Sequence, residues 1–209
     1  MIQEVLDRFA QERCSAILRT NDQGVARQAM QAAVRGGFTL VEFTMTVPGA
    51  LELIEEFAAK DGLIVGAGTV LEPQQARMAV QAGARFLVSP IVDPEIIGLA
   101  HELGAVAIPG TSSPTEMVHA TRVGAQIVKL FPAHEKGPAY VKACLGPLPH
   151  LRILPTSGVT ADNVTDFLRA GSFGVGFVAP LFDPQELAAR EFDCVEQRAR
   201  DLIARVRAS

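Results

Sequence analysis

At residues 84–110 the sequence reads ARFLVSPIVDPEIIGLAHELGAVAIPG. An apolar run ends at Pro90, a segment of helical periodicity ends at Gly104, and a second apolar run ends at Pro109 and Gly110. Short apolar runs bounded by Pro or Gly are typical of buried strands, and a Gly after helical periodicity is typical of a helix end. The stretch therefore predicts a strand, a crossover helix and a second strand parallel to the first.

The same alternation extends along the rest of the chain. The apolar runs are eight in number, and they are CSAILR (14–19), GFTLVEF (37–43), GLIVGAG (62–68), ARFLVSP (84–90), AVAIPG (105–110), AQIVKLFP (125–132), LRILPTSG (151–158) and FGVGFV (173–178). Helical periodicity occupies segments between them, such as 23–37, 48–60, 72–83, 93–104, 113–124 and 160–171. Eight strands alternating with helices predict a closed α/β TIM barrel, (β/α)₈, whereas a doubly wound open sheet uses fewer strands.

The remaining segments fit the same architecture. Residues 1–13 predict an extra helix before the first strand, and residues 190–208 predict a long terminal helix. Prolines at or just after the strand ends mark the C-terminal rim of the barrel, and they are Pro90, Pro109, Pro132, Pro155 and Pro180. No linker interrupts the pattern, so residues 1–209 are expected to form a single domain.

The composition excludes several classes of protein. The net charge is −4, Trp is absent and Tyr occurs once, so neither a nucleic-acid site nor an anionic membrane surface is expected as a partner. The N-terminal segment contains neither a signal-peptide core nor a membrane span, which predicts a cytoplasmic location. The cysteines and histidines lack metal-ligand spacing, so neither a metal nor a disulfide is expected; His134 alone lies close to a strand end, as a rim residue or a catalytic one.

One of the apolar runs, AQIVKLFP, contains a lysine. Because side chains alternate along a strand, Lys129 shares a face with Ile127 and Phe131, and one face of a barrel strand looks inward. Lys129 and Glu42 both fall toward the C-terminal ends of their strands, where TIM barrels carry their active sites. Burial lowers the pKa of a lysine, and a neutral amine can attack a carbonyl to form a Schiff base. Two interpretations stay open, a Schiff-base nucleophile or a structural Lys129–Glu42 ion pair.

Glycine-containing segments follow the last two strands, PTSG at 155–158 and GVGF at 174–177. TIM barrels commonly bind phosphate at this position through backbone N–H groups. Ser157, Gly158 and Gly176 are therefore candidate substrate-binding residues, and tight turns without a ligand are the alternative. GVGF does not complete GxGxxG, which argues against a nicotinamide cofactor.

Almost the whole chain resembles the 2-keto-3-deoxy-6-phosphogluconate aldolase family, also called the KHG/KDPG aldolases. The resemblance lies in the ordered motifs VEFT, GAGTV, SP, IPG, VKLFPA and PTSGV, and its most specific pieces are GAGTVLEPQQ (66–75) and KLFPA (129–133). It implies a class I aldolase that needs no metal or cofactor and assembles as a homotrimer. Such an enzyme splits a 2-keto-3-deoxy sugar acid, 6-phosphorylated or not, into pyruvate and an aldehyde.

The resemblance also implies roles for individual residues. Lys129 would be the Schiff-base lysine and Glu42 the general acid and base. Thr69, Pro90 and Thr156 would line the pyruvate pocket, and Arg19 would lie near the anionic groups of the substrate.

Several positions depart from the pattern of the family. The usual E-x-x-x-R motif has Thr46 in place of the arginine that is expected to bind the keto-acid carboxylate. Other departures are Ile91 in the SPG turn, Ser157 in the PTGG motif, Val178 in the GGS motif and His134 after the FPA motif. We therefore expect weaker binding of phosphorylated substrates.

Two other functions are considered beside the aldolase. An enamine on Lys129 would equally serve an oxaloacetate decarboxylase. A non-catalytic descendant of the fold that binds a keto acid is the other alternative; the loss of the arginine favours it, whereas the presence of both Lys129 and Glu42 argues against it.

Overall fold

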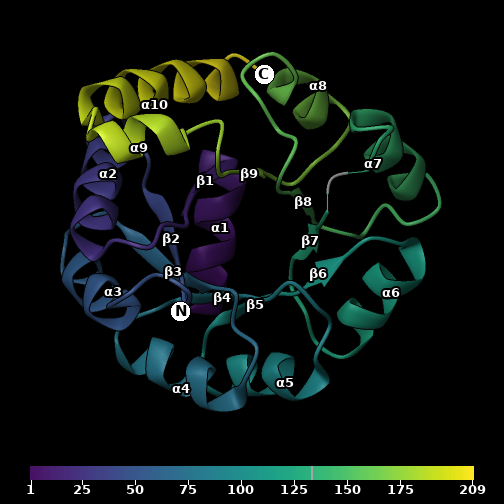
Figure 1. Ribbon diagram of the computed structural model, residues 1–209. Helices are drawn as coiled ribbons and strands as arrows, with labels where there is room; N and C mark the ends of the chain where they lie inside the picture. Colours follow the sequence, from purple (N-terminus) through teal and green to yellow (C-terminus); the bar gives the residue numbers. More distant parts are fainter. Residues whose placement is uncertain (133) are drawn as a thin grey trace.

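A ring of parallel strands surrounded by helices confirms the predicted (β/α)₈ barrel (Figure 1). The computed structural model describes residues 1–132 and 134–209, so Ala133, the last residue of the KLFPA motif, lies outside the described residues. None of the described helices is long and apolar enough to cross a membrane.

The secondary structure follows the predicted alternation. The strands are β1 (Cys14–Leu18), β2 (Leu40–Thr44), β3 (Ile64–Gly68), β4 (Phe86–Val88), β5 (Val106–Ile108), β6 (Gly110–Thr111), β7 (Val128–Leu130), β8 (Ile153–Pro155) and β9 (Val175–Phe177). The helices are α1 (Ile2–Glu12), α2 (Gln23–Arg35), α3 (Ala50–Ala58), α4 (Pro73–Gln81), α5 (Pro94–Glu102), α6 (Pro114–Arg122), α7 (Pro138–Leu145), α8 (Val164–Arg169), α9 (Pro184–Ala189) and α10 (Phe192–Arg207).

The strands form two parallel sheets that together complete the ring. One sheet has the order β5-β4-β3-β2-β1-β9 and the other has the order β6-β7-β8. β5 and β6 are two pieces of one predicted strand, which is interrupted at Pro109 because proline has no N–H to donate to a neighbouring strand. The ring closes on its other side through a parallel bridge between Thr156 and Gly176.

α1 covers the N-terminal end of the barrel. Figure 1 shows this helix across the centre of the ring of strands. Its buried residues Val5, Leu6 and Phe9 pack against the inward-facing side chains near the strand beginnings, such as Leu40 and Phe86. The Phe9 and Phe86 rings meet edge to face with their centres 5.2 Å apart. This apolar layer leaves the C-terminal end of the barrel as the open end.

Two glycines of β3 make room for larger side chains inside the barrel. A Cβ atom at Gly66 would overlap the Phe86 ring, and one at Gly68 would overlap Oε1 of Glu42. These two glycines therefore serve close packing, and Gly68 is the reason why the Glu42 carboxyl fits inside the barrel.

Periodicity did not predict α9. Its six residues are too few to display a helical repeat, but a local signal was present. The Asp183 side chain accepts hydrogen bonds from the N–H groups of Gln185 and Glu186, and Pro184 occupies the first turn. Asp93 and Pro94 begin α5 in the same way.

Candidate active site

A cavity of about 210 Å³ opens at the C-terminal ends of the strands. It is lined by Ile17, Arg19, Glu42, Thr44, Thr69, Lys129, Phe131, Thr156, Ser157, Gly158, Val178, Ala179 and Pro180. The structure thus brings together seven of the nine predicted site residues, although they come from strands and loops far apart in the sequence.

Lys129 extends from β7 into this cavity and is only 9% exposed. Its Nζ lies 4.6 Å from the centre of the Phe131 ring. Burial lowers the pKa of the amine below 10.5; the negative charge of Glu42 opposes this shift and the positive charge of Arg19 adds to it. A larger fraction of Lys129 is therefore neutral, and so nucleophilic, than of a solvated lysine.

Glu42 extends from β2 into the same cavity and is 2% exposed. Burial raises the pKa of its carboxyl from 4.5 to about 7, against the opposing effects of Lys129 and Arg19. Among the described residues, Glu42 and Lys129 form no direct ion pair. With a pKa near neutrality, the carboxyl can both donate and accept a proton, as a general acid and base must.

Two residues at the mouth of the cavity have unusual backbone conformations. Thr69 has a φ of 57° and Ser157 a φ of 69°, in the left-handed region that favours glycine. This conformation is particularly unfavourable for a β-branched residue such as Thr69. Arg19 donates a hydrogen bond of 3.1 Å to Oγ1 of Thr69, which fixes the guanidinium at the mouth. Backbone strain of this kind concentrates at binding and catalytic sites.

The opposite wall of the cavity comes from the residues after β8. Thr156 is 1% exposed, and its Oγ1 has no hydrogen-bond partner among the described residues. A buried hydroxyl without a partner is costly, so a ligand that hydrogen-bonds to it would bind more favourably. Ser157 and Gly158 continue this wall toward the rim.

Two predicted site residues lie outside the lining of the cavity. A Cβ atom at Gly176 would come within 2.6 Å of side-chain carbons of Ile17 and Thr156, so this glycine serves close packing. Pro90 lies against Gly110: a Cβ atom added to Gly110 would overlap backbone atoms of Pro90. Their assigned roles in substrate binding stay predictions.

Several lining residues were not predicted from the sequence. Thr44 follows Glu42 by two residues and Ile17 precedes Arg19 by two, so the strand period could have found both. Thr44 Oγ1 lies 2.9 Å from Oγ1 of Thr46, within hydrogen-bond distance. Ala179 and Pro180 follow β9 in a loop without periodicity; the proline signal placed Pro180 at the rim of the barrel but placed neither residue in the lining.

His134 contacts α7. Its ring stacks on Tyr140 with the ring centres 3.8 Å apart, and its Nδ1 accepts a hydrogen bond of 3.1 Å from the N–H of Lys136. His134 does not belong to the lining of the cavity. Within residues 1–132 and 134–209, no group of three His, Cys, Asp or Glu side chains is arranged to hold a metal ion.

Comparison with known proteins shows similarity along most of the chain. The model of the family described as KDPG and KHG aldolase matches residues 5–198. The chain is 37% identical over 174 residues to a probable 2-dehydro-3-deoxy-6-phosphogalactonate aldolase of Rhizobium meliloti, with 81% of each chain covered. It is 33% identical over 198 residues to the 2-dehydro-3-deoxy-6-phosphogalactonate aldolase of Escherichia coli, with 92% of each chain covered.

Solved structures show the same relationship. A structure described as native KDPGal superimposes with a TM-score of 0.85 at 30% identity, covering 93% of this chain and 94% of the other. KDPG aldolase from Legionella pneumophila, with pyruvate captured as a covalent carbinolamine intermediate, has a TM-score of 0.83 at 25% identity. That superposition covers 93% of this chain and 95% of the Legionella protein.

Proposed function

Because the chain belongs to the KDPG and KHG aldolase family, we propose that Lys129 is the residue that forms the Schiff base in this carbon–carbon lyase. The proposal rests on one observation: the buried side chains of Lys129 and Glu42 line the same cavity, where the pKa of the amine is lowered and that of the carboxyl is raised. The substrate is a 2-keto-3-deoxy sugar acid, and the products are pyruvate and an aldehyde.

In the first half of the reaction, neutral Lys129 attacks the C2 carbonyl carbon of the substrate. Proton transfer gives a carbinolamine, and protonated Glu42 donates a proton to its hydroxyl, which leaves as water. The product is an iminium ion between Nζ and C2, and Glu42 is now a carboxylate. The iminium can accept an electron pair from the adjacent C3–C4 bond.

In the second half, the Glu42 carboxylate removes the proton of the C4 hydroxyl. The C3–C4 bond breaks, C4 becomes the aldehyde carbon, and the bonding electrons pass to the iminium as an enamine. Glu42 returns its proton to C3 of the enamine, and addition of water then releases pyruvate and free Lys129. Burial of Lys129 and Glu42 assists because charged intermediates interact more strongly with fixed protein groups away from bulk water.

The other lining residues position the substrate in this proposal. Arg19 and the Thr69 hydroxyl would contact the keto-acid carboxylate, and the Thr156 hydroxyl, which has no partner among the described residues, would donate to a substrate oxygen. Ser157 and Gly158 line the cavity, and backbone N–H groups near them would contact an anion farther along the substrate.

A comparison of substrates tests this function. Pyruvate release is measured by steady-state kinetics from matched phosphorylated and unphosphorylated 2-keto-3-deoxy acids, with the parent and with Thr46→Arg. The parent is expected to cleave the unphosphorylated acids better, because Val178 supplies no hydroxyl to a phosphate, whereas Thr46 lacks a charge for the keto-acid carboxylate that both kinds of substrate carry. Parent turnover of the phosphorylated acid at a kcat/KM of about 10⁴ M⁻¹s⁻¹ or more contradicts the substrate preference, and no pyruvate from any acid contradicts the function.

The expected homotrimer belongs to the same proposal. Exposed apolar side chains on neighbouring elements support it, namely Leu71 (45%), Met78 (40%) and Ile91 (49%). Leu71 and Ile91 follow the adjacent strands β3 and β4, and Met78 lies on α4. Light scattering gives the mass in solution, and Ile91→Asp combined with Leu71→Asp is expected to lower it. A parent that is already monomeric contradicts the trimer.

A further inference from the structure

The Glu42 carboxyl is buried, yet a general acid and base also exchanges its proton with solvent. The side chain is 2% exposed and lies in the wall of the catalytic cavity. A proton that passes between this carboxyl and bulk water needs a path, either through the mouth of the cavity or along the surrounding side chains. Hydroxyl groups can form such a path because each of them both donates and accepts hydrogen bonds.

Two hydroxyl groups follow Glu42 along the chain. Thr44 lines the catalytic cavity and is 1% exposed, whereas Thr46 is exposed to solvent. Their Oγ1 atoms are 2.9 Å apart, so either hydroxyl can donate a hydrogen bond to the other. A single hydrogen bond therefore joins a buried position inside the barrel to the surface.

The register of β2 and β3 places the Glu42 carboxyl beside Thr44. Thr44 pairs with Gly68 of β3, and a Cβ atom added to Gly68 would overlap Oε1 of Glu42. Oε1 therefore occupies the space that a side chain of Gly68 would take, next to Thr44 on the neighbouring strand. Because neighbouring strands are about 5 Å apart, the Thr44 hydroxyl can reach this carboxyl directly or through one water molecule.

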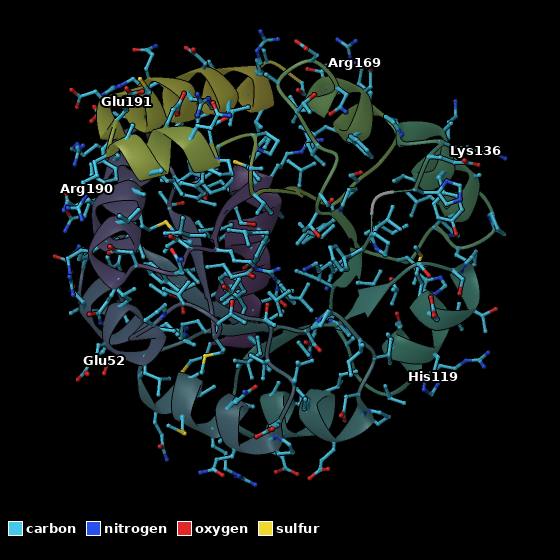
Figure 2. The ribbon with its side chains drawn as sticks, viewed as in Figure 1. Glu52, His119, Lys136, Arg169, Arg190 and Glu191 are labelled. Atoms are coloured by element: carbon cyan, nitrogen blue, oxygen red, sulfur yellow. The ribbon has the colours of Figure 1, made fainter. Side chains whose placement is uncertain are left out.

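Thr46 lines a second cavity of about 620 Å³, here called the outer cavity. Arg190 lines it as well; its side chain is 60% exposed, and Figure 2 shows it at the edge of the molecule. The outer cavity is therefore open to solvent. Because Thr44 lines the catalytic cavity and Thr46 lines the outer cavity, their hydrogen bond connects the two.

We propose that Thr44 and Thr46 form a proton relay between Glu42 and the solvent of the outer cavity. The inference rests on the proposed Schiff-base function, to which it adds a route for the protons of Glu42. Protonated Glu42 gives its proton to Oγ1 of Thr44, the former proton of Thr44 passes to Oγ1 of Thr46, and that of Thr46 passes to water. Each hydroxyl gains one proton and loses one, so only Glu42 and the water change their protonation. The reverse sequence returns a solvent proton to Glu42.

The relay serves exchange with solvent more than cleavage itself. In cleavage, Glu42 receives the proton of the C4 hydroxyl and delivers it to C3, so the proton stays inside the catalytic cavity. In the iminium formed from pyruvate alone, the Glu42 carboxylate removes a proton from the C3 methyl group and leaves an enamine. If Glu42 does not exchange with solvent, the same proton returns to C3. Exchange of the methyl protons of pyruvate in D₂O therefore measures the route from Glu42 to solvent.

Proton NMR of pyruvate in D₂O tests the relay. Loss of the methyl signal is followed with the parent and with Thr44→Val and Thr46→Val, in which a methyl group replaces the hydroxyl. Cleavage of a 2-keto-3-deoxy acid is measured on the same three proteins. In both variants the ratio of the exchange rate to the cleavage rate is expected to fall by about tenfold, the effect of one lost hydrogen bond on a rate.

Three further variants sharpen the test. Thr44→Ser and Thr46→Ser keep the hydroxyl and are expected to restore exchange, which a loss caused by altered packing would not predict. Thr20→Val is the matched control, because Thr20 lines the same outer cavity but does not belong to the hydrogen-bonded pair. Its exchange and cleavage rates are expected to equal those of the parent.

Three results would overturn the proposal. They are an unchanged exchange rate in either valine variant, an equal loss of exchange and cleavage in both, and slow exchange that the serine variants do not restore. Covalent labelling of Lys129 by pyruvate and borohydride, measured on the same preparations, separates failure of the relay from failure of the Schiff-base function. A labelled parent that exchanges no methyl protons overturns the relay alone, whereas a parent without label on Lys129 overturns both.

Discussion

Near the beginnings of the strands, the inward-facing side chains include Leu40 and Ile127, which pack in one cluster with Phe9 of α1. Two residues farther along the same faces, the inward-facing side chains are Glu42 and Lys129. One end of the barrel interior is therefore apolar and covered by a helix, and the other end carries charged groups around an open cavity.

Within a single strand, the side chain near the beginning therefore stabilises the fold, and the side chain near the end is reactive. The apolar layer stabilises the fold because it removes aromatic and aliphatic surface from water. Burial of Glu42 and Lys129 without a direct ion pair is unfavourable, but it shifts both pKa values toward neutrality. Glu42 and Lys129, here called the charged layer, are therefore more reactive but make the fold less stable. Substitutions in the charged layer are expected to reduce turnover, and substitutions in the apolar layer are expected to reduce stability.

The largest expected effect is on turnover, for Lys129→Met. Loss of the nucleophile is expected to lower kcat on the order of 10⁶-fold, as removal of a covalent nucleophile does. The free energy of unfolding is expected to stay equal or rise, because methionine fills the space without a buried amine. Pyruvate release and urea unfolding measure the two quantities. A variant that unfolds more easily than the parent would show that Lys129 also stabilises the fold, which contradicts its assignment to chemistry alone.

Glu42→Gln is expected to lower kcat by about 10² to 10⁴, the typical contribution of general acid and base catalysis. The amide keeps the shape of the side chain against Gly68 but cannot shuttle protons. Pyruvate release by the purified variant measures the effect, with Glu52→Gln on the surface of α3 as the control. Parent-like turnover would show that another group carries the protons.

In the apolar layer, Phe9→Ala is expected to lower the free energy of unfolding by about 3–5 kcal/mol. The ring packs edge to face on Phe86 and is fully buried, so its removal leaves a cavity under the strands. The thermal midpoint should fall by roughly 10 °C, with kcat nearly unchanged at temperatures where the variant is folded. A loss of kcat comparable to that of Glu42→Gln would contradict the separation of the two layers.

The smallest expected effect is the pH dependence of stability that Glu42 causes. Its pKa is about 7 in the folded protein against 4.5 without burial, so between these pH values the folded state binds a proton that the unfolded state has lost. Stability from this group is therefore present below pH 4.5 and is lost as the pH rises through 7, by about 3 kcal/mol in total.

Urea unfolding at a series of pH values from 4.5 to 8 measures this loss, and the comparison is made with Glu42→Gln. As the pH rises, the free energy of unfolding of the parent is expected to decrease relative to that of the glutamine variant. The lowered pKa of Lys129 acts in the opposite sense at higher pH, where stability increases as the pH approaches 10.5. If the free energies of unfolding of parent and variant differed by the same amount at every pH, Glu42 would titrate as a solvated carboxyl.

Much of the fold and the centre of the site could be predicted from the sequence, because both depend on periodicity. A strand period of two residues placed Lys129 inside the barrel, and the alternation of strands with helices brought it to the same end as Glu42. The strand interruption at Pro109 and the short helix α9 were not predicted. Each is decided by one or two residues rather than by a repeat.

Other features of the site depend on loop geometry that no sequence pattern shows. Thr69 has a left-handed conformation, and the buried Thr156 hydroxyl has no partner in the part of the chain that the structure describes; both features appear only when neighbouring strands are assembled. A second cavity, lined by Arg19 and Arg190 among others, is also invisible in the sequence, since these two residues lie at opposite ends of the chain. Residues that motifs placed in the pocket, such as Pro90, lie outside its lining, because a motif does not specify side-chain direction.

We infer that burial makes Lys129 the reactive amine of this chain. The most direct test is incubation with pyruvate and borohydride, followed by peptide mapping of the label. Lys136 and Lys142 are internal controls because both side chains are exposed, and Figure 2 shows Lys136 at the outer edge of the molecule. One label per chain is expected, on Lys129. A label on Lys136 or Lys142 instead, or no label on a folded protein, would contradict it.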